Sequence, residues 1–133
     1  MITRFRAWHK TWEEMGKVKR IRFDDDGNVT TVLFKGETLG TDLRVDEIEL
    51  MQSTGFFDKN GKEIFDGDMF GTKKDGLLNG IIEYREDLGM WTNSLIRYNN
   101  FERLCNVASS REVIGNVYEN PELLELEADH DRN

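Results

Sequence analysis

The chain has 133 residues, of which 38% are hydrophobic, 11% aromatic and 33% charged, a composition that excludes a disordered chain and predicts a single folded domain over residues 1–133. Cys105 is the only cysteine, so an intrachain disulfide and a C-x-x-C zinc site are excluded. The net charge of -8 disfavours a polyanionic partner unless the basic side chains are gathered on one face.

The first part of the chain predicts short strands. Residues 4–8 alternate polar and apolar side chains, as a half-buried strand does. Residues 17–23 and 29–34 flank an Asp-Gly turn at 24–28 and predict a β-hairpin. Simple alternation along 17–23 puts one set of side chains (Lys19, Ile21 and Phe23) on one side and the other set (Val18, Arg20 and Arg22) opposite.

The remainder continues this pattern. Residues 35–47 show no clear period and predict a loop or a short helical turn. Further strands are expected at 48–53, 64–71, 80–85, 90–96 and 113–118, with a second hairpin turn at 86–89. Pro121 can begin a short helix over 122–128, and residues 129–133 are expected to fray. Many short strands predict a mainly β fold, and closure into a small barrel would leave the fewest exposed edges.

Residues 50–69 form the most informative stretch, because several turn sites crowd into fewer than twenty residues. This stretch resembles the central motif of the YopX family of phage and prophage proteins. The matching residues are Met51, Gln52, Thr54, Gly55, Asp58, Asn60, Gly61, Glu63, Ile64, Gly67 and Asp68. Residues 4–8 resemble the family's opening motif and residues 113–124 its closing motif.

The resemblance implies a barrel related to SH3-like folds, with an amino-terminal β extension, a phage or prophage origin and self-association. It implies no reaction. The candidate binding residues are those of the central motif: Gln52, Thr54, Gly55, Asp58, Asn60, Gly61, Gly67 and Asp68. Two interpretations are open for them. They brace a turn-rich loop through side-chain to backbone hydrogen bonds, or they form a polar cluster around a groove.

Nothing in the sequence favours catalysis, a cofactor or a metal. Asp58 to Glu63 superficially resembles a calcium loop. The EF-hand requires its glycine at the sixth position of the loop, however, and Gly61 is at the fourth. His9 and His130 lie near opposite ends, and Cys105 is expected to be a small core residue. No P-loop, dinucleotide-binding motif or nucleophile elbow is present. We therefore predict a non-enzymatic protein.

Charge distribution leaves the partner open. Residues 1–22 carry a net charge of +5 and residues 23–133 a net charge of -13. The charges can be a solvated surface, or the basic segment can contact a protein partner or the acidic end of a second copy. The alternative is a nucleic-acid face formed by Arg4, Arg6, Lys17, Lys19, Arg20 and Arg22. The start of the chain lacks the apolar core of a signal peptide, which predicts a cytoplasmic protein without a membrane span.

Overall fold

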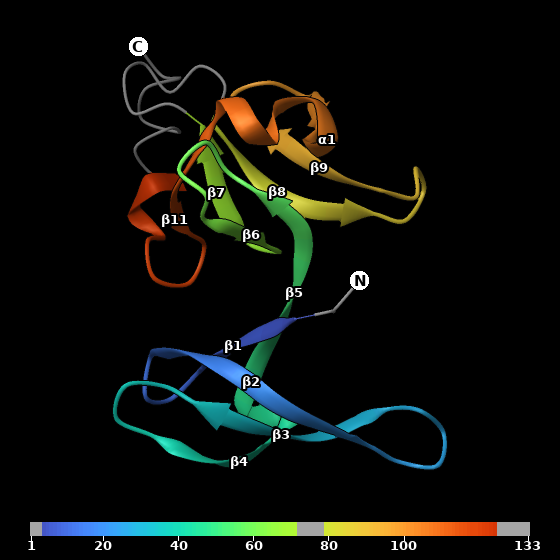
Figure 1. Cartoon of the computed structure of the whole chain (residues 1–133), viewed down its shortest axis with the longest axis vertical. Helices are drawn as coiled ribbons and strands as arrows, with labels where there is room; N and C mark the ends of the chain where they lie inside the picture. Colours follow the sequence, from blue (N-terminus) through green and yellow to red (C-terminus); the bar gives the residue numbers. More distant parts are fainter. Residues whose placement is uncertain (1–3, 72–78, 125–133) are drawn as a thin grey trace. The chain divides into compact units, whose positions relative to one another are not determined.

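A computed structural model describes residues 4–71 and 79–124 of the chain. The fold is mainly β, as predicted, and its strands divide between two compact units, Met1–Ser53 and Thr54–Asn133 (Figure 1). Among the described residues, no helix has the length and apolar character needed to cross a membrane.

The first unit is an antiparallel sheet. Its strands belong to a six-stranded sheet in the order β4-β3-β2-β1-β5-β6, whose last strand, β6, falls in the second unit. Their bounds are β1 Phe5–His9, β2 Glu14–Phe23, β3 Val29–Lys35, β4 Gly40–Arg44 and β5 Ile48–Phe57, with a 3-10 turn η1 at Val45–Glu47. The predicted hairpin is confirmed: the backbone N–H of Asp24 donates to Asn28 O at 2.9 Å. Gly27 adopts a φ of 85°, which the turn requires and glycine permits.

One face of this sheet packs into a core. Directly opposed residues on antiparallel strands point to the same side, and Val32 opposes both Ile21 and Leu43. The core consists of Ala7, Val32, Phe34, Leu43 and Ile48. Gly16 lies against the Phe34 ring, where an added Cβ would approach ring carbons to 2.5 Å. The residues that alternate with these core positions along each strand point to the opposite face of the sheet.

Strand β5 runs through the boundary between the units, with Ile48–Gln52 paired to β1 and residues 54–57 in the second unit. The second unit contains β6 Glu63–Phe65, β7 Asp68–Gly71, β8 Gly80–Arg85, β9 Met90–Leu95, β10 Phe101–Arg103, the short helix α1 Leu104–Val107, the 3-10 turn η2 Ala108–Ser110 and β11 Glu112–Asn116. Five of its strands form an antiparallel sheet in the order β10-β9-β8-β7-β11. Its core is Ile64, Phe70, Ile82, Leu104 and Ala108.

The expectation of a closed barrel is wrong for the part of the chain that the structure describes. No strand pairing within residues 4–71 and 79–124 closes either sheet into a ring. The edges are instead protected by brevity and irregularity: β6 and β10 have three residues each, and β11 bulges between Val113 and Gly115. These features protect the sheet edges without closure, and the SH3-like architecture is not confirmed.

Several local predictions are refined. The strand expected at 64–71 is two strands, since Gly67 with a φ of 85° breaks it between β6 and β7. The stretch 35–47 contains β4 as well as the expected helical turn. A helical turn covers 122–124 directly after Pro121, as predicted. The rest of that predicted helix and the frayed end at 129–133 lie outside the described residues.

Candidate functional site

Asp58 organises the loop of the central motif. The residue is 6% exposed, and its Oδ1 accepts hydrogen bonds from the backbone N–H groups of Asn60 and Lys62, both at 2.9 Å. Oδ2 accepts from the backbone N–H of Val113 at 3.0 Å. Burial raises the pKa of Asp58, but the three N–H donors outweigh burial and hold it below its ordinary value. Gly61 completes the turn with a φ of 80°.

Two other polar residues of the motif also bind backbone. Thr54 Oγ1 donates to Ile64 O at 2.8 Å and accepts from the N–H of Phe56 at 3.1 Å. Asp68 is 1% exposed and accepts from the N–H of Phe65 at 2.7 Å. These contacts match the bracing interpretation, in which buried carboxylates and hydroxyls satisfy loop amides.

The remaining motif residues divide into exposed side chains and glycines. Gln52 and Asn60 are exposed and make no side-chain hydrogen bond within the described chain. Gln52 lies in the first unit and the other polar motif residues in the second. Gly55, like Gly61 and Gly67, has a positive φ, here 81°. The interpretation of the set as a polar cluster around a groove stays a prediction.

The closing motif completes the same scaffold. Strand β11 pairs with β7, and Lys59 N donates to Arg111 O at 2.9 Å. The N–H of Val117 donates to Gly67 O at 3.0 Å. Asn116 Oδ1 accepts from the N–H groups of Tyr118 and Glu119. Hydrogen bonds within one unit thus join two motifs that lie about 50 residues apart in sequence. Both motifs therefore help to hold the fold of that unit.

Four of the six predicted nucleic-acid residues meet on one face of the first unit's sheet. Arg6 opposes Lys17, and Lys17 opposes Lys35, so three cations lie side by side across β1, β2 and β3. The next rows on this face hold Arg20 beside Leu33, and Arg22 beside Thr31, which in turn opposes Arg44. We call this surface the basic face; its cations are Arg6, Lys17, Arg20, Arg22, Lys35 and Arg44.

A β-bulge creates this arrangement. The register shifts between Val18 and Arg20, which leaves Lys19 as the extra residue. Simple alternation would send Lys17 and Arg20 to opposite faces, and that expectation is wrong. The bulge instead turns Val18 and Ile21 both toward the core and turns Lys17 and Arg20 both outward.

Lys35 and Arg44 are not among the nucleic-acid residues predicted from the sequence. Lys35 follows the predicted strand 29–34 by one residue, and Arg44 lies on a strand hidden in a stretch without clear period. The alternation of Thr31, Leu33 and Lys35 was the available signal. Arg4 is exposed and directly precedes β1.

The charge of the basic face is only partly balanced. By register, Asp42 and Glu49 lie among its six cations, and Glu49 pairs with Lys10 at 3.5 Å. Arg20 pairs with Asp42 at 3.3 Å, and Arg44 pairs with Asp46 and Glu47. Lys17, Lys19, Arg22 and Lys35 are exposed and form no ion pair with any residue of the described chain. Trp8, half-buried, points to the same side as Arg6.

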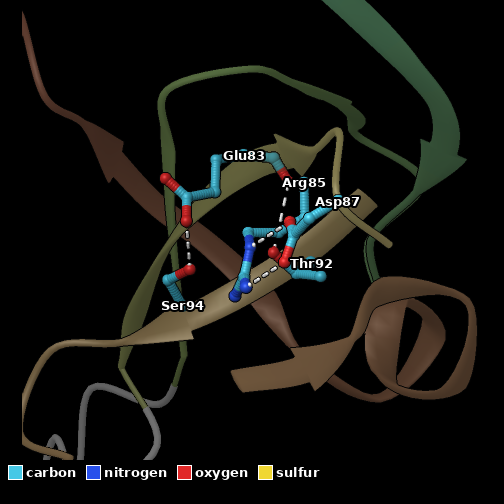
Figure 2. Close-up of polar contacts among 5 residues, drawn as sticks. All are labelled: Glu83, Arg85, Asp87, Thr92 and Ser94. Atoms are coloured by element: carbon cyan, nitrogen blue, oxygen red, sulfur yellow. Dashed lines mark hydrogen bonds and ion pairs between the residues drawn. The ribbon is translucent and has the colours of Figure 1, made fainter. Parts of the chain in front are cut away.

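A second polar cluster, unforeseen from the sequence, lies on β8 and β9 (Figure 2). Arg85 donates to both carboxylate oxygens of Asp87, at 2.9 and 2.7 Å. This bidentate pairing raises the pKa of Arg85 and lowers that of Asp87. The Ser94 hydroxyl donates to Glu83 Oε1 at 2.5 Å, and Thr92 Oγ1 donates to Glu83 O at 3.3 Å. The Glu83 contacts link β8 to β9, and the charges of Arg85 and Asp87 neutralise each other.

The residues considered for metal binding or catalysis are dispersed. Within the described ranges, no group of three His, Cys, Asp or Glu side chains is placed to hold a metal ion. His9 is buried, and its Nδ1 accepts from the N–H of Trp12 at 3.1 Å. Cys105 is exposed, so the prediction that it packs in the core is wrong. His130 lies outside the described residues.

Comparison with known proteins adds the family. A family model described as YopX protein matches residues 4–125, nearly the whole chain. The chain belongs to the YopX family. The crystal structure of protein EF1440 from Enterococcus faecalis is similar, with a TM-score of 0.70 and 29% identity over 93% of this chain and 99% of that one.

Protein yopX from Bacillus subtilis shares the fold, with a TM-score of 0.56, 24% identity and coverage of 93% of this chain and 97% of that one. A search of curated proteins finds no match. The recognition of a YopX-like chain from its three motifs is thus confirmed.

Proposed function

We propose that this YopX-family protein acts by binding another protein and not by catalysis. The observation that carries the proposal is an aromatic patch at the β8–β9 hairpin. Tyr84 is 48% exposed and Leu88 39% exposed, and Tyr84 stacks edge-on against the half-buried Trp91 at a centroid distance of 5.3 Å. Exposed aromatic side chains are typical of protein interfaces.

The geometry of the central motif supports the non-catalytic part. A catalytic carboxylate must reach a substrate, whereas Asp58 directs both of its oxygens to backbone N–H groups. Asp68 is likewise buried against backbone. The residues that most resemble acid–base candidates are therefore used to hold the loop.

The partner can be a host or phage protein, with a second copy of the chain as a further candidate. The net charge of +5 on residues 1–22 against -13 on the remainder supports self-association between unlike ends. A phage or prophage origin and a place in the bacterial cytoplasm belong to the same proposal and rest on the family's motifs and on the lone cysteine.

Self-association is tested by light scattering across a concentration series at 50 and 500 mM salt. Tyr84→Ser should weaken association about tenfold or more, the effect expected of an aromatic anchor at an interface. Tyr98→Ser is the matched control, because Tyr98 is 49% exposed on the same unit but outside the patch.

A heterologous partner is tested by placing a photo-crosslinking residue at position 84 or 98 in cells that carry the protein. Equal crosslinking at both positions, together with equal self-association of both serine variants, would contradict the assignment of the patch.

A further inference from the structure

The basic face of the first unit has a feature that the protein-binding proposal does not use. Arg6, Lys17 and Lys35 oppose one another on three adjacent strands, which lie about 5 Å apart in a sheet. Like charges directly opposite on a sheet destabilise it. A surface with no ligand would gain stability if these positions alternated in sign, as Arg20 and Asp42 do on either side of Leu33 in the next row.

From this juxtaposition we propose that the basic face binds single-stranded nucleic acid, with its phosphates along the Lys17–Lys35 row and bases against Trp8. The inference goes beyond the proposed protein contact and uses a different surface. Lys17, Arg22 and Lys35 supply cations that no described carboxylate neutralises. A polyphosphate backbone relieves their mutual repulsion and releases counterions.

The shape of the surface favours a single strand over a duplex groove. The cations of β2 and β3 are exposed on one face of the sheet, and a sheet that carries cations and an aromatic side chain is a common platform for splayed bases. Trp8 lies next to Arg6 on β1, between Met15 and Glu49 on the neighbouring strands. An indole beside a cation row permits one base to stack while its phosphates meet the lysines.

An acidic protein segment is the competing occupant of the same charges. The chain's own acidity, -8 overall, makes this a real alternative, and the experiment separates the two. Neither occupant involves the Tyr84 patch, so loss of one activity leaves the other measurable.

The test is fluorescence anisotropy of a labelled 20-nucleotide mixed-sequence DNA strand titrated with the full chain at 50 to 200 mM salt. Lys17→Glu with Lys35→Glu should weaken binding at least tenfold. It should also reduce the slope of log affinity against log salt by about 1.4, because each single-strand phosphate contact contributes about 0.7. The matched control is Lys62→Glu with Arg103→Glu, which makes the same charge change at two exposed cations of the second unit. Circular dichroism checks that both double variants remain folded.

Two further arms test the occupant. In a Trp12→Phe, Trp91→Phe background, Trp8 is the only tryptophan, and its fluorescence should be quenched by the DNA strand. Polyglutamate of equal charge should compete at least tenfold less well than unlabelled DNA. The proposal is overturned if the unmodified chain does not retain the strand at 50 mM salt, if both double variants lose binding equally, if Trp8 is not quenched, or if polyglutamate competes as well as DNA.

Discussion

Replacing Asp58 by alanine should uncouple the central loop from β11. The substitution removes the acceptor for three backbone N–H groups, those of Asn60, Lys62 and Val113. The Val113 donor is partly buried, and an unsatisfied buried donor costs about 1–3 kcal/mol. The two turn donors can turn to water, so each should cost about 0.5–1 kcal/mol. The sum is about 3 kcal/mol of unfolding free energy.

The measurement is urea unfolding followed by Trp91 fluorescence in a Trp8→Phe, Trp12→Phe background, because Trp91 packs against the core of the unit that contains Asp58. With a slope near 1.5 kcal/mol per molar urea, the midpoint should fall by about 2 M. The control is Asp25→Ala, since Asp25 is an exposed carboxylate at a hairpin tip and should change stability by less than about 0.5 kcal/mol.

The conservative variant sharpens the reasoning. In Asp58→Asn, the side-chain oxygen can retain either the two turn donors or the Val113 donor, but the amide nitrogen then faces the N–H that has lost its acceptor. Asparagine should therefore restore less than half of the stability lost in alanine. An unchanged midpoint for alanine, or full rescue by asparagine, would refute the bracing argument.

Three further outcomes follow from the same structure. Because the folded-state pKa of Asp58 lies below its ordinary value of 3.8, its contribution is fully present above that pH and is lost as pH falls through the lower folded value; unfolding curves of the parent and Asp58→Ala should converge in that acid range. Gly16→Ala should cost about 1–3 kcal/mol, because its Cβ would meet the Phe34 ring at 2.5 Å, whereas Gly40→Ala, with open space, should be near neutral in thermal melts. Calorimetric titration with calcium, magnesium or zinc should show no site tighter than millimolar, and a stoichiometric micromolar site would contradict the prediction that the protein has no metal site.

Local chemistry made part of this fold predictable. The hairpin turns at 24–28 and 86–89 and the Asp58 turn depend on residues close in sequence, and all three form as expected. The bulge at Lys19 was not predictable, because it depends on which apolar residues the core accepts: Val18 and Ile21 both turn inward, although alternation separates them. The basic face was not predictable for the same reason. Which cations lie opposite one another can be stated only when the strand register is known.

Long-range pairing explains the other differences. Nothing near Asp58 in sequence identifies Val113 as its third donor, since 55 residues separate them. The barrel expectation failed for a related reason: edge protection by a bulge or a three-residue strand leaves little trace in hydrophobic alternation. The expectation that the two units together form a single domain stays a prediction.

The division of the two cores has a consequence for how the protein tolerates change. Among the described residues, the buried cluster of the first unit lies between Ala7 and Ile48, and that of the second lies between Ile64 and Ala108. The chain passes from one unit to the other once, inside β5. A recombination event at residues 53–54 therefore exchanges a whole packed interior without splitting either one, so the two halves of this protein can diversify at separate rates.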